Sequence, residues 1–118
     1  MFFKIFARKK DKTPAWRQAE EKAARFLEKA ALKIVARNYH SRFGEIDIIA
    51  EEESVVHFVE VKATSGSYDP LERITSSKME KITKTIEYYI LKNGIKKEYQ
   101  IDAVVVTNSG IEWIKNIF

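Results

Sequence analysis

The stretch FGEIDIIAEEESVVHFVEVKATS, which covers residues 43–65, decides the fold class. It contains two runs rich in Ile and Val, Glu45–Glu51 and Val55–Ala63, and such runs are typical of β-strands. The acidic residues Glu51–Glu53 between them predict a turn. Together these segments predict a β-hairpin at the centre of the fold.

Three charged side chains, Asp47, Glu60 and Lys62, stand inside these otherwise apolar strands. Buried charge is costly unless it is paired or bound to a metal ion. Glu60 and Lys62 are two residues apart and therefore share one face of the strand. The hairpin register decides whether Asp47 joins them. A two-residue turn places Asp47 opposite Phe58, and a turn two residues longer places it opposite Glu60.

Both of these registers put the three charged residues on one side, whereas a turn with an odd number of residues separates them. The alternation of Ile46 and Ile48 against Val59 and Val61 favours the registers with a shared face. That alternation also predicts that the four apolar residues gather behind the sheet.

Two carboxylates on adjacent strands, with a lysine beside one of them, form a recognisable chemical unit. Carboxylate oxygens can hold Mg²⁺ or Mn²⁺ and leave positions for water and a phosphate oxygen. The lysine can orient or deprotonate the attacking water, or hold a phosphate oxygen. Glu20, on a predicted helix, is a candidate for a further carboxylate. The alternative is an internal ion pair that serves only the specificity of the fold.

The rest of the chain predicts two helices and further strands around the hairpin. These elements are a helix from Thr13-Pro14 to about Ala30, a strand at Leu32–Asn38, a loop at Thr64–Thr75, a helix that starts with a capping box at Ser77–Glu80 and ends at Gly94, a strand at Gln100–Thr107 and a short strand at Ile111–Ile114. The order α-β-β-β-α-β predicts a mixed sheet flanked by helices, an α/β or α+β fold. We expect residues 1–12 to form an apolar and basic N-terminal segment, and residues 13–118 a single domain.

The composition narrows the function classes. The 118 residues include no Cys and two His, which excludes disulfide scaffolds, thiolate zinc sites and cysteine catalysis. Hydrophobic residues make up 45% of the chain, which excludes a disordered protein, and no apolar run is as long as a membrane helix. We therefore expect a cytoplasmic protein with no membrane partner.

The charge is distributed unevenly along the chain. Residues 1–12 carry five basic residues and one acid, and residues 78–97 carry six Lys and two acids, so each segment is +4 in a chain of net charge +4. Basic segments suit a polyanion such as nucleic acid, and Arg37, Arg42 and Lys81 are candidates to contact its backbone. The simpler interpretation is a solvated helix face, a solvated loop and a tail.

The hairpin stretch resembles the core of the PD-(D/E)XK nuclease superfamily. More closely, it resembles the bacterial YraN-like (UPF0102-type) family, which is related to archaeal Holliday-junction resolvases. The likeness continues in AEEKAARFL, LKIVARNY, YDPLERITSSKMEKI and IEWIKNIF, and it covers nearly the whole chain after the first dozen residues. The chain departs from the family in Ala19, where Gly is usual, and in Thr64, where Arg is frequent.

The resemblance implies a restriction-endonuclease-like core and a metal-dependent endonuclease site carried by Glu20, Asp47, Glu60 and Lys62. The three carboxylates would hold Mg²⁺ or Mn²⁺, and branched or nicked DNA would be the substrate. Lys78 lies where the family usually has a basic residue, which implies a phosphate contact at the start of the second helix. Cutting both strands of a junction is easiest with two symmetric sites, so we also expect a homodimer.

Three hypotheses follow from the sequence. The first is a structure-directed, metal-dependent DNA endonuclease. The second is a nucleic-acid-binding module of the same fold with a silent site. The third is an interaction protein whose central charges form a closed ion-pair network. We expect His57, which lies among Val residues on the other face of its strand, to be a packed histidine and not a ligand.

Overall fold

A computed structural model describes residues 15–64 and 75–118. The elements in these ranges are α1 (Ala15–Lys29), β1 (Lys33–His40), β2 (Glu45–Glu51), β3 (Val55–Ala63), α2 (Ser76–Asn93), β4 (Glu98–Thr107) and β5 (Gly110–Ile114). The predicted hairpin strands are confirmed at both ends, and the expected terminal strand is present. The expected helix start at Thr13-Pro14 and the segment 1–12 lie outside the described residues.

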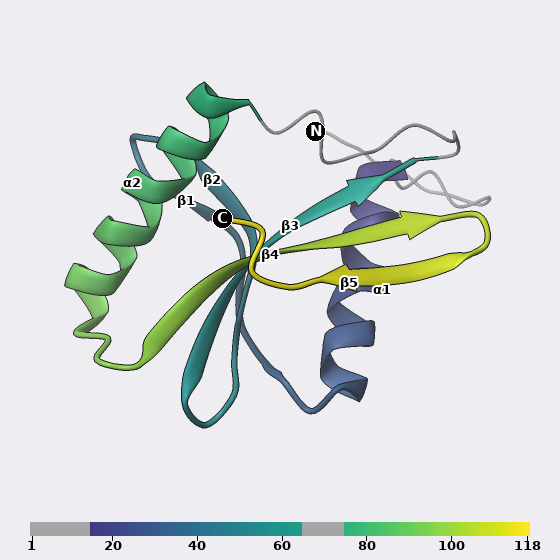
Figure 1. Cartoon of the computed structure of the whole chain (residues 1–118), viewed down its shortest axis with the longest axis horizontal. Helices are drawn as coiled ribbons and strands as arrows, with labels where there is room; N and C mark the ends of the chain where they lie inside the picture. The colour runs from purple at the N-terminus through teal and green to yellow at the C-terminus, as the bar shows by residue number, and fades with distance from the viewer. Residues whose placement is uncertain (1–14, 65–74) are drawn as a thin grey trace, which may run out of the picture.

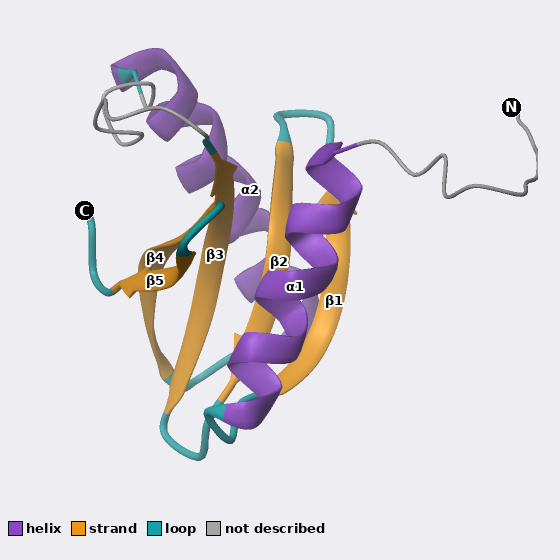
Figure 2. Ribbon diagram, turned by 90° about the vertical axis from the view of Figure 1, so that its right-hand side faces the viewer, coloured by secondary structure: helices purple, strands orange, loops and turns teal. Residues whose placement is uncertain are grey.

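The five strands form one mixed sheet in the order β1-β2-β3-β4-β5. β3 and β4 are parallel, with α2 between them in the chain, and the other neighbours are antiparallel. Figures 1 and 2 show the sheet between the two helices, with α1 over one face and α2 over the other. The predicted mixed sheet flanked by helices is confirmed. No helix in the described part of the chain is long and apolar enough to cross a membrane.

Each helix buries an apolar face against the sheet. The α1 cluster includes Ala19, Ala23, Ala24, Leu27, Ile48, Ala50, Val59 and Val104. The α2 cluster includes Met79, Ile82, Ile86, Tyr89, Ile46, Ile49, Val56, Phe58 and Ile101. Because both faces of the hairpin are covered, its strands are apolar on both sides.

The hairpin register follows the alternative with the longer turn. The pairs run from Glu51 opposite Val56 to Ile48 opposite Val59, and the next step along the hairpin puts Asp47 opposite Glu60. At the turn, the Glu52 amide donates to the Val55 carbonyl at 2.9 Å.

The expectation that Ile46 and Ile48 share a face is wrong. Ile46 packs in the α2 cluster and Ile48 in the α1 cluster. At the same level of the sheet, the neighbouring pairs on β1 place Asn38 opposite Asp47, and Asn38 has a φ of 52°. Asn tolerates this left-handed conformation better than most residues, and the alternation of β1 is interrupted there, since Asn38 and Tyr39 are both half-buried.

The start of α2 also differs from the expectation. The N-cap is Thr75, not Ser77, and the Thr75 hydroxyl accepts a hydrogen bond from the Lys78 amide at 3.1 Å. A Thr hydroxyl at this position satisfies a free amide of the first turn as well as Ser77 would, and it lets the helix start earlier. The predicted end is confirmed, because Gly94 adopts a φ of 60° and its amide bonds back to the last turn.

Candidate functional site

The backbone ladder between β2 and β3 gives way to side-chain bonds beyond the Ile48–Val59 pair. Asp47 Oδ2 accepts from the Val61 amide at 2.8 Å, and Glu60 Oε2 accepts from the Asp47 amide at 3.5 Å. Each carboxylate thus accepts a hydrogen bond from a backbone amide of the other strand. These bonds hold the two acidic side chains together where the hairpin opens.

Both carboxylates lie in surroundings that disfavour negative charge. Glu60 is only 3% exposed, and burial, with the Asp47 carboxylate beside it, raises the pKa of Glu60 to about 8. Burial also raises the pKa of Asp47, although the hydrogen bond from Val61 opposes this. A proton or a cation close to these two acids stabilises them by offsetting their mutual repulsion.

Two lysines face this acidic pair. Burial and the neighbouring Lys78 ammonium lower the pKa of Lys62 to about 8. Lys78 Nζ lies 3.9 Å from Glu60 Oε1, and the Lys78 side chain remains 44% exposed. The structure therefore brings Asp47, Glu60, Lys62 and Lys78 together, as the sequence predicted for the first three.

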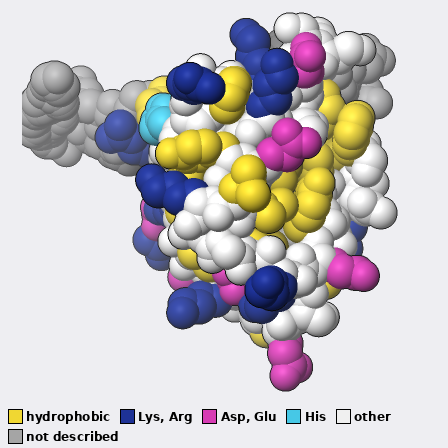
Figure 3. All heavy atoms as spheres, turned by 90° about the vertical axis from the view of Figure 1, so that its left-hand side faces the viewer, with side chains coloured by type: hydrophobic (Ala, Val, Ile, Leu, Met, Phe, Trp, Pro, Cys, Tyr) yellow, Lys and Arg dark blue, Asp and Glu magenta, His cyan; other side chains and the backbone are white. Residues whose placement is uncertain are grey.

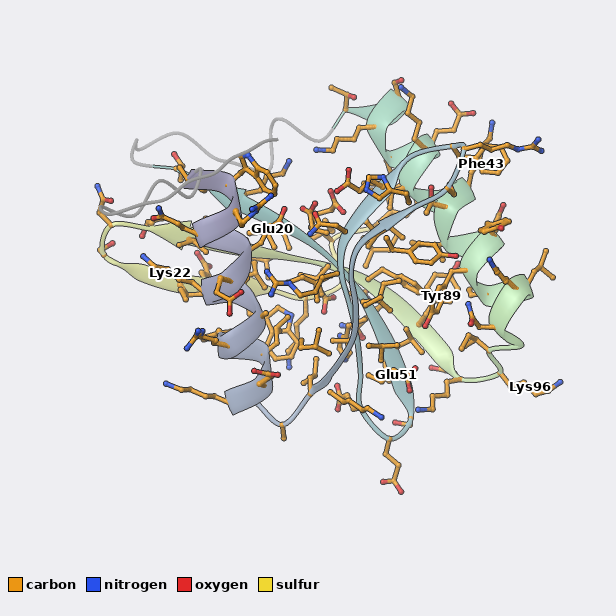
Figure 4. The ribbon with its side chains drawn as sticks, turned by 180° about the vertical axis from the view of Figure 1, so that it is seen from behind. Glu20, Lys22, Phe43, Glu51, Tyr89 and Lys96 are labelled. Carbon is orange, nitrogen blue, oxygen red and sulfur yellow. The ribbon has the colours of Figure 1, made fainter. Side chains whose placement is uncertain are left out.

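Glu20 reaches the neighbourhood of the site from α1. It is 6% exposed, and its pKa is raised by burial and by Asp47, while a hydrogen bond with Asn38 opposes the rise. Figure 4 shows the side chain extending from α1 toward the strands. Its Oε1 atom has no hydrogen-bond partner among the described residues. A buried oxygen without a partner is costly, and a bound cation or water would satisfy it.

The donor set fits a hard cation through two ligands. Within residues 15–64 and 75–118, no three acidic or histidine side chains lie close enough together to hold a metal ion. The structure thus places Glu20 near the pair without making it a third ligand. Mg²⁺ commonly uses one or two carboxylates, several waters and the phosphates of its substrate, and Asp47 and Glu60 are donors of that kind.

The predicted nucleic-acid contacts separate into two groups. Lys78 lies at the site, Lys81 is exposed one turn further along α2, and Arg42 lies in the β1–β2 turn with its guanidinium over the ring of Phe43. Arg37 instead pairs with Glu21 of α1 at 2.7 Å, on the other side of the sheet.

A second buried network, which was not among the expected sites, lies at the opposite end of β3. His57 Nδ1 lies 2.7 Å from Asp102 Oδ2, and His57 Nε2 lies 2.6 Å from Glu52 Oε2. Asp102 also accepts bonds from the Trp113 indole and the Gln100 amide. His57 is thus a packed histidine, as expected. Asp102 is the one acidic residue in the apolar run IDAVVV, and this is the sequence signal that could have indicated a buried polar network. Both of its carboxylate oxygens have hydrogen-bond partners within the protein.

Comparisons with known proteins show which protein family the chain resembles. The model of uncharacterised protein family UPF0102 matches residues 19–106. A UPF0102 protein of Campylobacter jejuni subsp. jejuni is 50% identical over 98 residues, which cover 83% of this chain and 88% of the relative. A UPF0102 protein of Campylobacter concisus is 47% identical over 102 residues, covering 86% and 90%. One of Nitratiruptor sp. is 46% identical over 101 residues, covering 86% and 89%. The chain therefore belongs to the UPF0102 family.

Proposed function

We propose that this protein is a metal-dependent endonuclease of the PD-(D/E)XK type that hydrolyses DNA phosphodiester bonds. One observation carries the proposal. Two carboxylates, the half-buried Asp47 and the buried Glu60, lie side by side at the open end of the hairpin, next to Lys62, whose pKa is lowered to about 8. Such a cluster needs a cation, and it offers an acid–base group close to that cation.

Each residue has a role in this proposal. Asp47 and Glu60 would hold Mg²⁺ or Mn²⁺, which when bound acidifies a water and neutralises charge on the phosphate. Lys62, with a pKa near the working pH, would accept a proton from the attacking water or orient it. Lys78 would hold a phosphate oxygen, and Glu20 would bond a water next to the ion through its unpartnered oxygen.

Other parts of the proposal have different support. The mixed sheet between two helices supports a restriction-endonuclease-like core. Branched or nicked DNA as the substrate rests on the resemblance of the sequence alone. So does a homodimer, in which two sites would cut both strands. A cytoplasmic location is proposed from the composition, which lacks Cys.

Cleavage of a supercoiled plasmid and of a labelled four-way junction in Mn²⁺ tests the activity. We expect the wild-type protein to cut, and the variants Asp47→Asn and Lys62→Met to lose the activity. Glu53→Gln and Lys92→Met are matched controls, because both residues are exposed and lie away from the site. Equal cleavage by all variants would reveal a contaminating nuclease and overturn the proposal.

A second candidate is a nucleic-acid-binding module with a silent site. It is favoured by the lack of a three-ligand group in the described ranges and by Lys78 Nζ, which lies 3.9 Å from Glu60 and can itself serve as the cation. This candidate predicts binding that weakens with salt and no cleavage with any divalent ion. Binding and cleavage measured on the same junction separate the two candidates.

A further inference from the structure

A row of cations runs along α2 away from the site. Lys78, Lys81 and Lys84 follow one another at intervals of three residues, and all three are exposed. At 1.5 Å per residue, the row spans about 9 Å along the helix axis. Lys78 starts the row beside Glu60, so the row is continuous with the site.

The β1–β2 turn is fastened to α2 beside this row. Ser41 Oγ lies 2.8 Å from Oγ1 of the buried Thr85, and the Thr85 hydroxyl bonds to the Lys81 carbonyl at 3.0 Å. Gly44 approaches the helix so closely that a Cβ atom there would lie 3.3 Å from Lys81 Cβ. The turn therefore packs directly against this part of α2.

Phe43 brings a fourth cation to the row. The Arg42 guanidinium carbon lies 5.0 Å from the centroid of the Phe43 ring, and Lys84 Nζ lies 5.9 Å from it. A cation over an aromatic face is held there by the ring quadrupole. The acidic neighbour Glu80 lies 4.0 Å from Lys84 Nζ, but this pair is exposed and therefore weak. Figure 3 shows Lys and Arg side chains on this face among acidic and apolar ones, and Figure 4 shows Phe43 at the turn beside α2.

We propose that Lys78, Lys81, Lys84 and Arg42 form a phosphate track for the DNA strand that leaves the site, with Phe43 as a positioning residue for the last two cations. The proposal rests on the proposed function and deepens it. Phosphates of one strand follow one another at about 3.4 Å along a duplex axis, so a row of about 9 Å spans roughly three of them. Contacts to phosphates carry no sequence information, and binding by the track is independent of sequence.

Fluorescence anisotropy with a labelled 20-base-pair DNA duplex, in EDTA so that no cleavage occurs, tests the track. The full chain is titrated at several KCl concentrations. The slope of log K against log salt is negative. For the double variant Lys81→Gln/Lys84→Gln, we expect its magnitude to decrease by roughly two, with affinity at low salt about tenfold weaker or more. The control Lys92→Gln/Lys96→Gln removes the same charge from exposed positions in the last turn of α2 and just beyond its C-cap, and we expect its slope to be unchanged.

Phe43→Leu tests the positioning role because it leaves the charge unaltered. We expect affinity to weaken about threefold to tenfold with an unchanged thermal midpoint, because the cations lose their support on the ring. Wild-type affinity in this variant would show that Phe43 does not position the cations.

The remaining outcomes separate the track from the nuclease activity. No binding by the wild-type chain, an unchanged slope in Lys81→Gln/Lys84→Gln, or an equal fall in both double variants would overturn the track. If the slope falls as expected but the wild-type chain cleaves no DNA in Mn²⁺, the track stands and the proposed activity fails. If the chain cleaves DNA and no variant changes the slope, the activity stands and the track fails.

Discussion

The half-buried Asp47 and the buried Glu60 lie side by side, and the ammonium groups of Lys62 and Lys78 face them. The nearest ammonium in an ion pair with Glu60 is that of Lys78, at 3.9 Å, and its side chain is partly exposed. Burial raises the pKa of both acids, so in the metal-free protein this pair takes up a proton more readily than an exposed carboxyl does. A divalent ion would have to displace that proton, so metal binding and protonation compete at this site.

The raised pKa of Glu60 predicts how stability depends on pH. Between the ordinary value of 4.5 and about 8, the folded protein binds a proton that the unfolded chain has released. The free energy of unfolding of the metal-free protein should therefore fall, by roughly a few kcal/mol at most, as the pH rises from 5 to 8. Urea denaturation in EDTA at several pH values measures this. Glu60→Gln should remove most of the fall, and a variant that keeps the full wild-type dependence would contradict the raised pKa.

The role proposed for Lys62 predicts that its removal affects the rate of DNA cleavage but not the affinity for Mn²⁺. Because it assists the attacking water and does not ligate the ion, Lys62→Met should lower the cleavage rate about 10²-fold to 10⁴-fold. The same change should leave the affinity for Mn²⁺ within a few-fold of wild type. Single-turnover cleavage and titration calorimetry measure the two quantities. A loss of Mn²⁺ binding equal to the loss of rate would mean that Lys62 acts on the ion site itself.

At the scale of elements, the β1–β2 turn and α2 are connected through one buried hydroxyl. Thr83 and Thr85 both donate to the carbonyl four residues earlier in α2, but only Thr85 also contacts Ser41. Thr85→Val leaves the Ser41 hydroxyl without this partner and should lower the free energy of unfolding by about 1–3 kcal/mol. Thr83→Val is the matched control and should cost less. Urea denaturation compares them, and equal losses would show that the contact with the turn contributes nothing.

The bounds of the hairpin could be predicted because its signals are local. Gly44 precedes the first run of β-branched residues, and the acidic turn separates it from the second. β2 and β3 therefore begin and end where apolar segments meet Gly or acidic residues. The opposite facing of Ile46 and Ile48 could not be predicted in this way. It coincides with the left-handed conformation of Asn38 in the neighbouring strand, which is not encoded in the pattern of the hairpin.

At the scale of the whole molecule, the site lies where the open end of the hairpin meets both helices. Asp47, Glu60 and Lys62 could be placed together from the sequence, since one hairpin joins them. The positions of Glu20 and Lys78 depend on how α1 and α2 pack on opposite faces of the sheet, which no local pattern specifies. The resemblance to a nuclease core implied roles for both residues. Only the structure shows that Lys78 lies close to Glu60, and that Glu20 does not form a three-ligand group with the two acids in the described part of the chain.

Crystals of the full chain soaked in Mn²⁺ at pH 8, with anomalous data collected near the manganese absorption edge, would locate the ion. We predict one strong anomalous peak between Asp47 and Glu60, with metal–oxygen distances of about 2.1 Å, and no such peak in Asp47→Asn crystals. Lys78 should then have moved away from Glu60. A wild-type site with no peak, in which a lysine ammonium occupies the space between the two carboxylates, would contradict the metal-dependent nuclease.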